Sequence, residues 1–482
     1  MKVLTHPMGH LLVTTALAAL GCSAEADSNG GTRGSGNTSQ FGNSPATDPA
    51  STTATDGFGN TNAVAPIGEQ QVLNPNAVPM AAVEASYIWI ANSLEGTVTK
   101  LDTRTLEEKG RYLTSPMGLG LPSRTSVAED GDVAVANRGG ASNAIGGDGG
   151  GVIKIYASID KCQDKNGNGM IDTSQGATDV RPWGEDECVA WFTPLPWWSN
   201  RPVAWAPPPA PDALADVWTA GATTCDGVLG CTIEVARLDG ATGAIKNMVS
   251  VPGLSGVDFI GSAIPFGGVV ILNYGPYGGA ADLGGNFWTF VSNTTQLIRI
   301  DAVTLQPRIW NIEPAGNGYG LTLDEKGRIF VCGMFGLSRF DPSTETWQNS
   351  GAGGPLLGMN GCMTDGAGKI WVGGGVDFGD PGLHAYDADT LAHVSSYAVG
   401  PVKGVSIDVD GFVWGVGSGG AVNVGAVLAG PNGEIPANTA WRVDPNTGDV
   451  SSYTGLNGAY SYSDMTGFGL AQAGYQEPPP LE

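Results

Sequence analysis

From Ser86 onward, the pattern of apolar and polar positions repeats along the chain. Each repeat contains a short apolar stretch, in most cases with an aromatic ring at its second position, followed by small residues. The ring is present at residues 88–92, 217–221, 287–290, 329–333, 370–374 and 413–417, and a weaker copy without it lies at 133–137. The rings of Trp288, Phe330, Trp371 and Trp414 lie 42, 41 and 43 residues apart. Short strands that recur with this period are typical of β-propeller blades.

A turn signature follows the apolar stretch in six of the repeats. It consists of an apolar residue and an Asp, with a Thr three positions after the Asp. The pairs are Asp102/Thr105, Asp239/Thr242, Asp301/Thr304, Asp341/Thr344, Asp387/Thr390 and Asp444/Thr447. Because Asp side chains accept hydrogen bonds from turn N–H groups, we expect these six to form hairpin turns and not to bind a ligand. Another Asp stands six residues before the ring at Asp324, Asp365 and Asp408, where an inner strand should turn into the next.

These signatures predict an all-β domain over residues 86–472, a seven-bladed β-propeller. The units begin near residues 87, 126, 201, 256, 319, 358 and 403, and the first lacks its inner strand. Residues 463–470 resemble the inner strand at 403–408, so we expect them to complete the first blade. Closing the ring in this way removes exposed sheet edges that would otherwise favour aggregation. Residues 473–482 remain as a tail.

The repeat region resembles the streptogramin lyase-like and NHL-type propellers, on the aspartate–glycine–aromatic pattern that is best in the last three units. Such propellers host many functions. For the lyases, the resemblance implies histidines and a glutamate around a magnesium ion on one face of the ring. The histidines of the repeat region are His384 and His393, both expected on outer strands of the sixth unit. This arrangement therefore has no matching positions here, and we expect both histidines to be surface or packing residues.

The N-terminal residues indicate export. Residues 11–20 form an apolar run that is too short to span a bilayer and is typical of the h-region of an export signal. The run leads into Gly21, Cys22 and Ser23, which resembles a bacterial lipobox with its Leu one position late. The resemblance implies that residues 1–21 are a lipoprotein signal peptide and that Cys22 carries a diacylglycerol anchor. An ordinary signal peptide with an incidental cysteine is the alternative.

Residues 22–80 are rich in Gly, Ser, Thr, Asn and Ala, with two aromatics and no Lys. Such a segment cannot bury enough apolar surface to offset its chain entropy, so we expect a disordered tether between the anchor and the propeller. If the host is Gram-negative, a Ser after the lipidated cysteine implies the outer membrane. We therefore expect an exported protein, lipid-anchored in the cell envelope, at the outer membrane or cell surface.

The charge of the chain limits the classes of partner that it can bind. Lys and Arg total 23 against 47 Asp and Glu, a formal net charge of −24. Such a chain repels nucleic acid and anionic membrane surfaces and attracts cations, although plain solubility also explains the charge. We expect no nucleic-acid partner, membrane contact through the lipid anchor only, and a monomer.

The odd number of cysteines agrees with a lipid anchor on Cys22, because six of the seven cysteines remain when Cys22 is set aside. Six cysteines in an oxidising compartment suggest three disulfides. Pairing between neighbours in the sequence gives Cys162–Cys188, Cys225–Cys231 and Cys332–Cys362, and the first two would each close a local insertion. Fifteen pairings exist, so neighbour pairing is one choice among them.

The insertion in the second unit, at residues 160–190, contains the most specific short motif. Oxygen-bearing side chains stand at its first, third, fifth and ninth positions, and Gly169 stands at the sixth. The motif resembles the calcium loop of EF-hands and dockerins, and the insertion is similar to calcium-loop segments of large secreted proteins of myxobacteria and their relatives. The resemblance implies a structural Ca²⁺ held by Asp164, Asn166, Asn168, the Met170 carbonyl, Asp172 and Gln175.

The last of these positions departs from the EF-hand pattern. Gln175 stands where EF-hands have a bidentate Glu, so we expect a modest affinity. A later acid could take its place, from the set Asp179, Glu185, Asp186 and Glu187. Because Cys162 and Cys188 flank the loop, we expect a calcium ion and a disulfide together to stabilise an insertion that has no hydrophobic core of its own. A Gly/Asn-rich turn that binds nothing is the alternative.

Six tryptophans follow the loop within 36 residues, at Trp183, Trp191, Trp197, Trp198, Trp205 and Trp218. Exposed Trp side chains bind sugar rings or Pro-rich peptides, but we favour packing of these rings against the blade. No nucleophile elbow, zinc-binding His pair or phosphate loop is present in the sequence.

Two classes of function therefore remain. The first is a calcium-stabilised binding or scaffold module for an unknown glycan or protein, which the tether and the acidic surface favour. The second is a streptogramin lyase-like enzyme, a lyase or hydrolase with a divergent site of carboxylates and a cation at the central channel.

Overall fold

The computed structural model describes residues 86–480, which belong to one compact unit of the chain. It leaves out residues 119, 140–149, 198–199, 211–212, 227–229, 255–263, 267–268, 272–274, 292–295, 314–317, 334–335, 352–353, 356, 359, 376–378 and 419–437. The expected signal peptide at 1–21, the tether at 22–80 and Cys22 thus lie outside the described residues. In the described part, no helix is long and apolar enough to cross a membrane.

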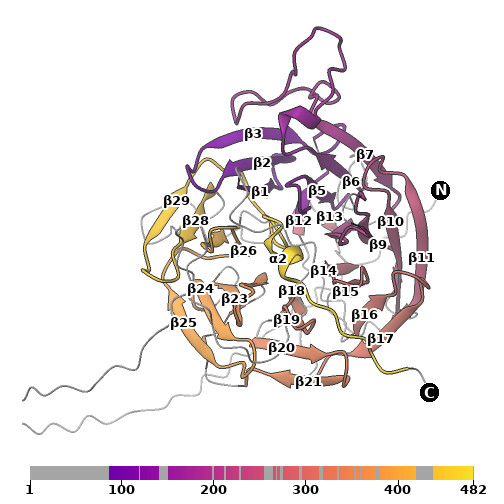
Figure 1. Cartoon of the computed structure of the whole chain (residues 1–482), viewed down its shortest axis with the longest axis vertical. Helices are drawn as coiled ribbons and strands as arrows, with labels where there is room; N and C mark the ends of the chain where they lie inside the picture. The colour runs from indigo at the N-terminus through magenta and orange to yellow at the C-terminus, as the bar shows by residue number, and fades with distance from the viewer. Residues whose placement is uncertain are drawn as a thin grey trace, which may run out of the picture. The chain divides into compact units, whose positions relative to one another are not determined.

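The strands form seven sheets arranged radially around an axis (Figure 1), which confirms the predicted all-β, seven-bladed β-propeller. Blade 1 contains β1 (Tyr87–Asn92), β2 (Thr97–Asp102) and β3 (Glu108–Leu113). Blade 2 contains β4 (Pro122–Val127), β5 (Val133–Asn137), β6 (Gly150–Ile155) and β7 (Val189–Leu195). Blade 3 contains β8 (Asn200–Trp205), β9 (Val217–Asp226), β10 (Gly230–Leu238) and β11 (Ile245–Leu254).

The other four blades repeat this order. Blade 4 contains β14 (Pro276–Ala281), β15 (Phe287–Val291), β16 (Gln296–Ile300) and β17 (Pro307–Asn311). Blade 5 contains β18 (Gly318–Leu323), β19 (Ile329–Gly333), β20 (Gly336–Asp341) and β21 (Thr346–Asn349). Blade 6 contains β22 (Cys362–Thr364), β23 (Lys369–Gly374), β24 (Gly382–Asp387) and β25 (His393–Tyr397). Blade 7 contains β26 (Gly404–Ile407), β27 (Val413–Val416), β28 (Ala440–Val443) and β29 (Val450–Tyr453).

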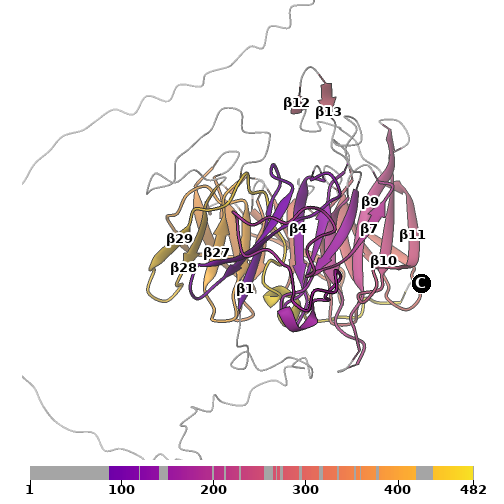
Figure 2. The same cartoon turned by 90° about the horizontal axis from the view of Figure 1, so that it is seen from above.

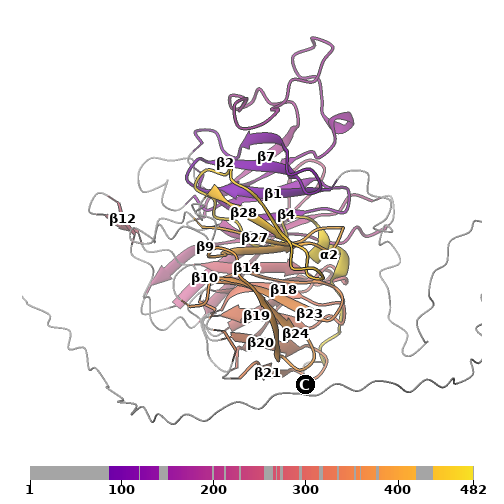
Figure 3. The ribbon, with the colours of Figure 1, turned by 90° about the vertical axis from the view of Figure 1, so that its left-hand side faces the viewer.

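The two faces of the ring differ. In each four-stranded blade the first strand is innermost, and it contacts the first strand of the next blade, as β4 contacts β8 and β14 contacts β18. A short helix, α2 (Phe468–Gln472), lies near the axis at the face where these inner strands end (Figures 1, 2 and 3). Gly474, which follows α2, donates its N–H to the Asp324 carbonyl just after β18 (2.8 Å). We call this the helix face, and the opposite face, where the inner strands start, the loop face.

The beginning and end of the propeller meet at blade 1. The Tyr460 N–H donates to the Ala91 carbonyl (3.0 Å), and the Trp89 N–H donates to the Met465 carbonyl (2.9 Å). Asn92 and Ala459 form an antiparallel bridge beside these bonds. Residues 459–465 therefore take the inner position next to β1. The C-terminal segment closes the ring as the sequence predicted, but it does so four residues earlier than the expected start at residue 463.

The expectation of a strand over residues 463–470 is wrong at its C-terminal end. Residues 468–472 form α2, because Asp464 organises a helical turn there. Its carboxylate accepts the N–H groups of Gly467 (2.8 Å) and Leu470 (2.8 Å). Gly467 has a φ of 85°, a left-handed conformation that suits Gly and redirects the chain into the helix.

Blade 4 begins later than the expected position near residue 256. Its inner strand is β14, which starts at Pro276. A separate hairpin of β12 (Ile264–Phe266) and β13 (Val269–Ile271) precedes it. Short apolar strands of this kind cannot be told from the inner strand of a blade by periodicity alone, which explains the difference.

The aromatic ring of each repeat is buried between blades, as Trp288 and Trp414 illustrate with no more than 1% exposure. Their indole N–H groups donate to the Asp six residues earlier, Asp282 (2.8 Å) and Asp408 (2.8 Å). A buried indole N–H with a partner avoids the cost of an unsatisfied donor. Asp282 stands six residues before its ring, as Asp324, Asp365 and Asp408 do, but it was not predicted from the sequence.

The six Asp/Thr pairs form hairpin turns, as predicted. In five of them the Asp carboxylate accepts the N–H of its Thr, for example from Thr390 to Asp387 (2.7 Å). The Asp341 carboxylate accepts the Ser343 N–H instead (3.0 Å). The residue after the Thr is left-handed in all six turns: Leu106, Gly243, Leu305, Glu345, Leu391 and Gly448.

Two of the predicted disulfides are present in the described residues. Cys162–Cys188 closes the base of the insertion between β6 and β7, and Cys332–Cys362 joins β19 of blade 5 to β22 of blade 6. Cys225 and Cys231 stand opposite each other in the pairing of β9 with β10. Their side chains lie outside the described residues.

The insertion packs against the outer strand of blade 1. The Arg111 N–H on β3 donates to Ser174 Oγ (2.9 Å). Ile171 and Trp183 of the insertion pack with buried Tyr112 of the same strand. The insertion therefore covers the edge of β3 and gains the core that it lacks by itself.

Candidate functional site

The inner strands bring arginine, lysine and tyrosine side chains together at the axis, near the loop face. We call this set the channel layer: Arg124 (β4), Arg138 (after β5), Arg201 (β8), Tyr277 (β14), Tyr319 (β18), Lys403 (before β26), and Tyr460 and Tyr462 of the closing segment. Arg138 is half-buried, and every other member is no more than 9% exposed. The layer combines groups from six blades.

The phenol groups of the layer are hydrogen-bonded to one another across the axis. The Tyr277 hydroxyl lies 3.1 Å from that of Tyr460 and 3.3 Å from that of Tyr319. Tyr319 and Tyr460 also share a hydrogen bond, and the Tyr460 hydroxyl lies 3.5 Å from that of Tyr462. Blades 1, 4 and 5 contribute these four groups, so the network spans the channel.

The cationic groups lie over the faces of these rings. The guanidinium carbon of Arg124 is 3.5 Å from the ring centre of Tyr462, and that of Arg201 is 4.4 Å from the ring centre of Tyr277. One guanidinium nitrogen of Arg201 donates to the Tyr462 hydroxyl (3.3 Å). The Lys403 ammonium is 4.2 Å from the ring centre of Tyr319. Cation–π contacts of this kind gain strength when they are desolvated.

The guanidinium groups change the ionisation of Tyr462. Burial alone would raise the pKa of its hydroxyl, but the charges of Arg124 and Arg201 outweigh burial and lower the pKa to about 7. Burial raises the pKa of Tyr277 and of Tyr319 well above the ordinary value. Tyr462 is therefore the member of the layer that can carry negative charge near neutral pH.

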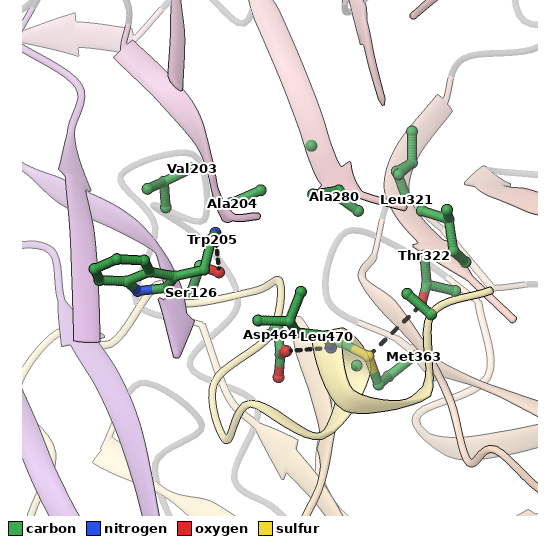
Figure 4. A pocket seen from close by; sticks show the side chains of 15 residues that line it. Ser126, Val203, Ala204, Trp205, Ala280, Leu321, Thr322, Met363, Asp464 and Leu470 are labelled. Atoms are coloured by element: carbon green, nitrogen blue, oxygen red, sulfur yellow. Dashed lines mark hydrogen bonds between the residues drawn. The ribbon is translucent and has the colours of Figure 1, made fainter. Parts of the chain in front are cut away.

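The other end of the axis is closed by α2 and has a different character. A small cavity there is lined mostly by apolar side chains such as Val203, Ala204 and Leu321, together with Ser126 and Asp464 (Figure 4). Asp464 accepts three backbone N–H groups, those of Thr466, Gly467 and Leu470. Its carboxylate is thus engaged in holding α2.

The expected calcium loop brings four of its side chains together. The Asp172 carboxylate accepts hydrogen bonds from the amides of Asn166 (2.7 Å) and Asn168 (2.7 Å) at the same oxygen. The Asp164 carboxylate accepts the N–H groups of Gly167 (2.6 Å) and Gly169 (2.8 Å). The oxygen and nitrogen ends of an Asn amide exchange by a simple flip, so these side chains fit an oxygen-coordinated cation.

Gln175 is not brought into this loop. Its amide donates to the Thr173 carbonyl (3.1 Å). Three of the later acids hold the backbone of the loop. Glu187 accepts the N–H groups of Lys165 (2.7 Å) and Asp172 (2.7 Å), Asp186 accepts that of Ser174 (2.9 Å), and Asp179 accepts that of Gln175 (3.1 Å). The described residues contain no group of three or more His, Cys, Asp or Glu that could hold a metal.

His384 and the described tryptophans have packing roles, whereas His393 is exposed. His384 on β24 is buried and hydrogen-bonds to Ser396 Oγ (2.8 Å), and His393 lies on β25, so both are on outer strands as expected. Trp197 and Trp205 are no more than 2% exposed, and Trp191 donates its indole N–H to the Gly240 carbonyl (3.2 Å).

The channel layer was not predicted from the sequence. Its members come from blades far apart in the chain, and no spacing connects them. The signal that was present is the position of each residue, because most stand at or within three residues of the start of a blade's first strand. In an acidic chain, Arg and Lys at this repeated position are the pattern that would have indicated the layer.

No family model matches this chain, and no curated protein matches it in sequence. A solved structure of a putative 6-phosphogluconolactonase from Bacteroides fragilis matches with a TM-score of 0.50 and 10% identity, over 80% of this chain and 99% of that one. A streptogramin B lyase matches with a TM-score of 0.43 and 14% identity, over 68% of this chain and 86% of that one. A virginiamycin B lyase from Staphylococcus aureus with quinupristin matches with a TM-score of 0.40 and 10% identity, over 69% of this chain and 83% of that one. At such identities the likeness shows the shared propeller fold alone.

Proposed function

We propose that this protein is an exported, lipid-anchored binding module, whose propeller recognises a glycan or a protein of the cell envelope through its loop face. The observation that carries the proposal is the channel layer. Cationic and phenolic groups from six blades converge at the loop-face end of the axis, whereas α2 occupies the other end. Converging polar groups of this kind are typical of binding sites.

A lyase or hydrolase based on carboxylates has less support. Asp464 lines the cavity at the helix face, and its carboxylate is occupied by backbone N–H groups. The channel layer consists of guanidinium, ammonium and phenol groups, which orient a ligand but do not supply paired carboxylates for acid–base catalysis.

In this proposal the other parts of the chain position the ring. Cys22 carries the lipid, and residues 22–80 hold the propeller away from the membrane. In a Gram-negative cell that membrane is the outer one. A calcium ion at Asp164, Asn166, Asn168 and Asp172 fastens the insertion against blade 1, and the protein acts as a monomer.

The test is binding of the purified protein to fractionated envelope polysaccharides and proteins, with one variant for each face. Met117 precedes β4 on the loop face and is 62% exposed, whereas Val303 lies in a helix-face turn and is 89% exposed. We expect Met117→Glu to weaken binding and Val303→Glu to leave it unchanged. Loss of binding in Val303→Glu alone, or the absence of any envelope partner, would overturn the proposal.

A further inference from the structure

The channel layer has the opposite charge to the rest of the protein. The chain has a formal net charge of −24, but the layer contains four cationic side chains, Arg124, Arg138, Arg201 and Lys403, and no carboxylate. Arg124 and Arg138 have hydroxyl and carbonyl oxygens as hydrogen-bond partners and form no ion pair with a carboxylate in the described part of the chain. Buried charges are normally paired with opposite charges, so the absence of a carboxylate partner for Arg124 and Arg138 among these described residues is unusual.

Arg124 shows the imbalance most directly. Its side chain is 1% exposed, and its Nε is a buried donor without a hydrogen-bond partner among the described residues. Its other nitrogens donate to Ser463 Oγ (2.9 Å) and the Tyr319 carbonyl (3.3 Å). Leaving a charged donor unsatisfied in the interior destabilises the folded state. An acceptor supplied by a ligand would remove this cost.

The donors around Arg124 suit a small oxyanion. Arg124 and Arg201 lie against the ring of Tyr277, at 5.4 Å and 4.4 Å from its centre, and both also contact Tyr462. The Tyr460 hydroxyl lies beside them, 3.5 Å from that of Tyr462. Guanidinium forks and hydroxyl groups are the donors that recognise carboxylate and phosphate groups.

We infer that the channel layer binds an oxyanion group of the ligand, a carboxylate or a phosphate, beside Arg124 and Arg201. This inference rests on the proposed function, because it names the chemical class of group that the loop face recognises. The half-buried Arg138, which lies over the Tyr460 ring at 4.9 Å, stands on the approach from that face. The lowered pKa of Tyr462 is consistent with a site whose field favours negative charge.

The experiment follows the ultraviolet absorbance of tyrosinate in the purified protein as pH is raised, with D-glucuronate, inorganic phosphate or neutral glucose. An anion beside Tyr462 adds negative charge, so it should raise the midpoint of the Tyr462 titration in a saturable way and raise the melting temperature. Glucose should do neither. A response to glucuronate or to phosphate alone identifies which oxyanion the layer takes.

Two variants make the test specific. Arg124→Gln should weaken the anion response about tenfold, or about 1.4 kcal/mol. Arg339→Gln is the matched control, because Arg339 is also buried and donates to the backbone carbonyls of Ala388 and Asp389 at the rim. It should keep the full response. If Arg124→Gln does not fold, Arg201→Lys tests the same point while retaining the charge, and bidentate geometry should still be lost.

The outcomes separate this inference from the proposed function. No saturable response to either anion would overturn the inference, even if the protein binds envelope components. An equal response in Arg124→Gln and in wild type would overturn it as well. A response to anions without any envelope partner would support the inference and contradict the proposed function.

Discussion

The guanidinium group of Arg124 lies over the ring of Tyr462, with 3.5 Å between its carbon and the ring centre, and both side chains are no more than 1% exposed. Arg124 comes from blade 2, and Tyr462 comes from the segment that closes blade 1. The contact therefore joins the closure of the ring to the charge of the channel. A pH change that alters Tyr462 should for this reason alter the stability of the whole propeller.

The free energy of unfolding should rise between about pH 7 and pH 10, because Tyr462 ionises in the folded protein before it does in the unfolded chain. Its folded pKa is lowered to about 7, so its contribution is complete above the unfolded pKa and is lost as pH falls through the folded one. Burial lowers the pKa of Lys100 to about 8, which acts in the same direction. Chemical denaturation at several pH values, with Tyr462→Phe as the comparison, measures the share of Tyr462.

The other groups that face Tyr462 do not reverse this sign. Burial lowers the pKa of Arg124, which acts in the same direction. Burial raises the pKa of the three neighbouring phenols, Tyr277, Tyr319 and Tyr460, so they oppose stability only at more alkaline pH. Tyr462→Phe should therefore show a smaller rise with pH. An identical pH slope in the variant and in wild type would contradict the assignment.

Removing residues 457–482 should destabilise the ring, because it exposes the inner edge of β1. That edge is covered by the bonds between Trp89 and Met465 and between Ala91 and Tyr460. We expect oligomers by light scattering and a lower melting temperature. Removing residues 475–482 alone is the control and should leave the protein monomeric. A monomeric, stable protein without residues 457–482 would contradict the closure.

Chelation of calcium should increase protease cleavage within residues 162–188 and lower the melting temperature. Asp164→Ala should have the same effect, because the Asp164 carboxylate stands among the oxygens that converge in the loop. Gln175→Ala is the control, because its amide bonds to the Thr173 carbonyl and not to the side chains that converge around Asp172. If calcium changed neither cleavage nor melting in wild type, the loop would be a turn that binds no metal.

Replacing both Cys332 and Cys362 by Ala should lower the free energy of unfolding by about 3 kcal/mol, since the cross-link restricts the unfolded chain. The pair is separated by 30 residues and joins blades 5 and 6. The Cys162–Cys188 pair offers a contrast, because it closes one insertion. Its removal should increase proteolysis of the insertion more than it lowers global stability, and the reverse order would contradict these roles.

The sequence predicted the features that repeat locally. The Asp/Thr turns and the aromatic rings define each blade, because hydrogen bonds within three to six residues fix them, as from Trp414 to Asp408. It did not predict α2, although the bonds from Gly467 and Leu470 to Asp464 also span three and six residues, because the resemblance of residues 463–470 to an inner strand favoured a strand there. It also did not predict the channel layer, whose contacts, such as Tyr277 with Tyr460, depend on seven blades meeting at one axis.

The most direct test of the account is anomalous diffraction from a crystal of the protein soaked in selenate, a tetrahedral oxyanion with an anomalous signal. We predict a selenium peak at the channel layer, within hydrogen-bonding distance of the guanidinium groups of Arg124 and Arg201, and its loss in Arg124→Gln. The account would be contradicted if selenate bound only elsewhere in the crystal. In that case no selenium peak would lie at the channel layer, and Arg124 and Arg201 would still contact Tyr462.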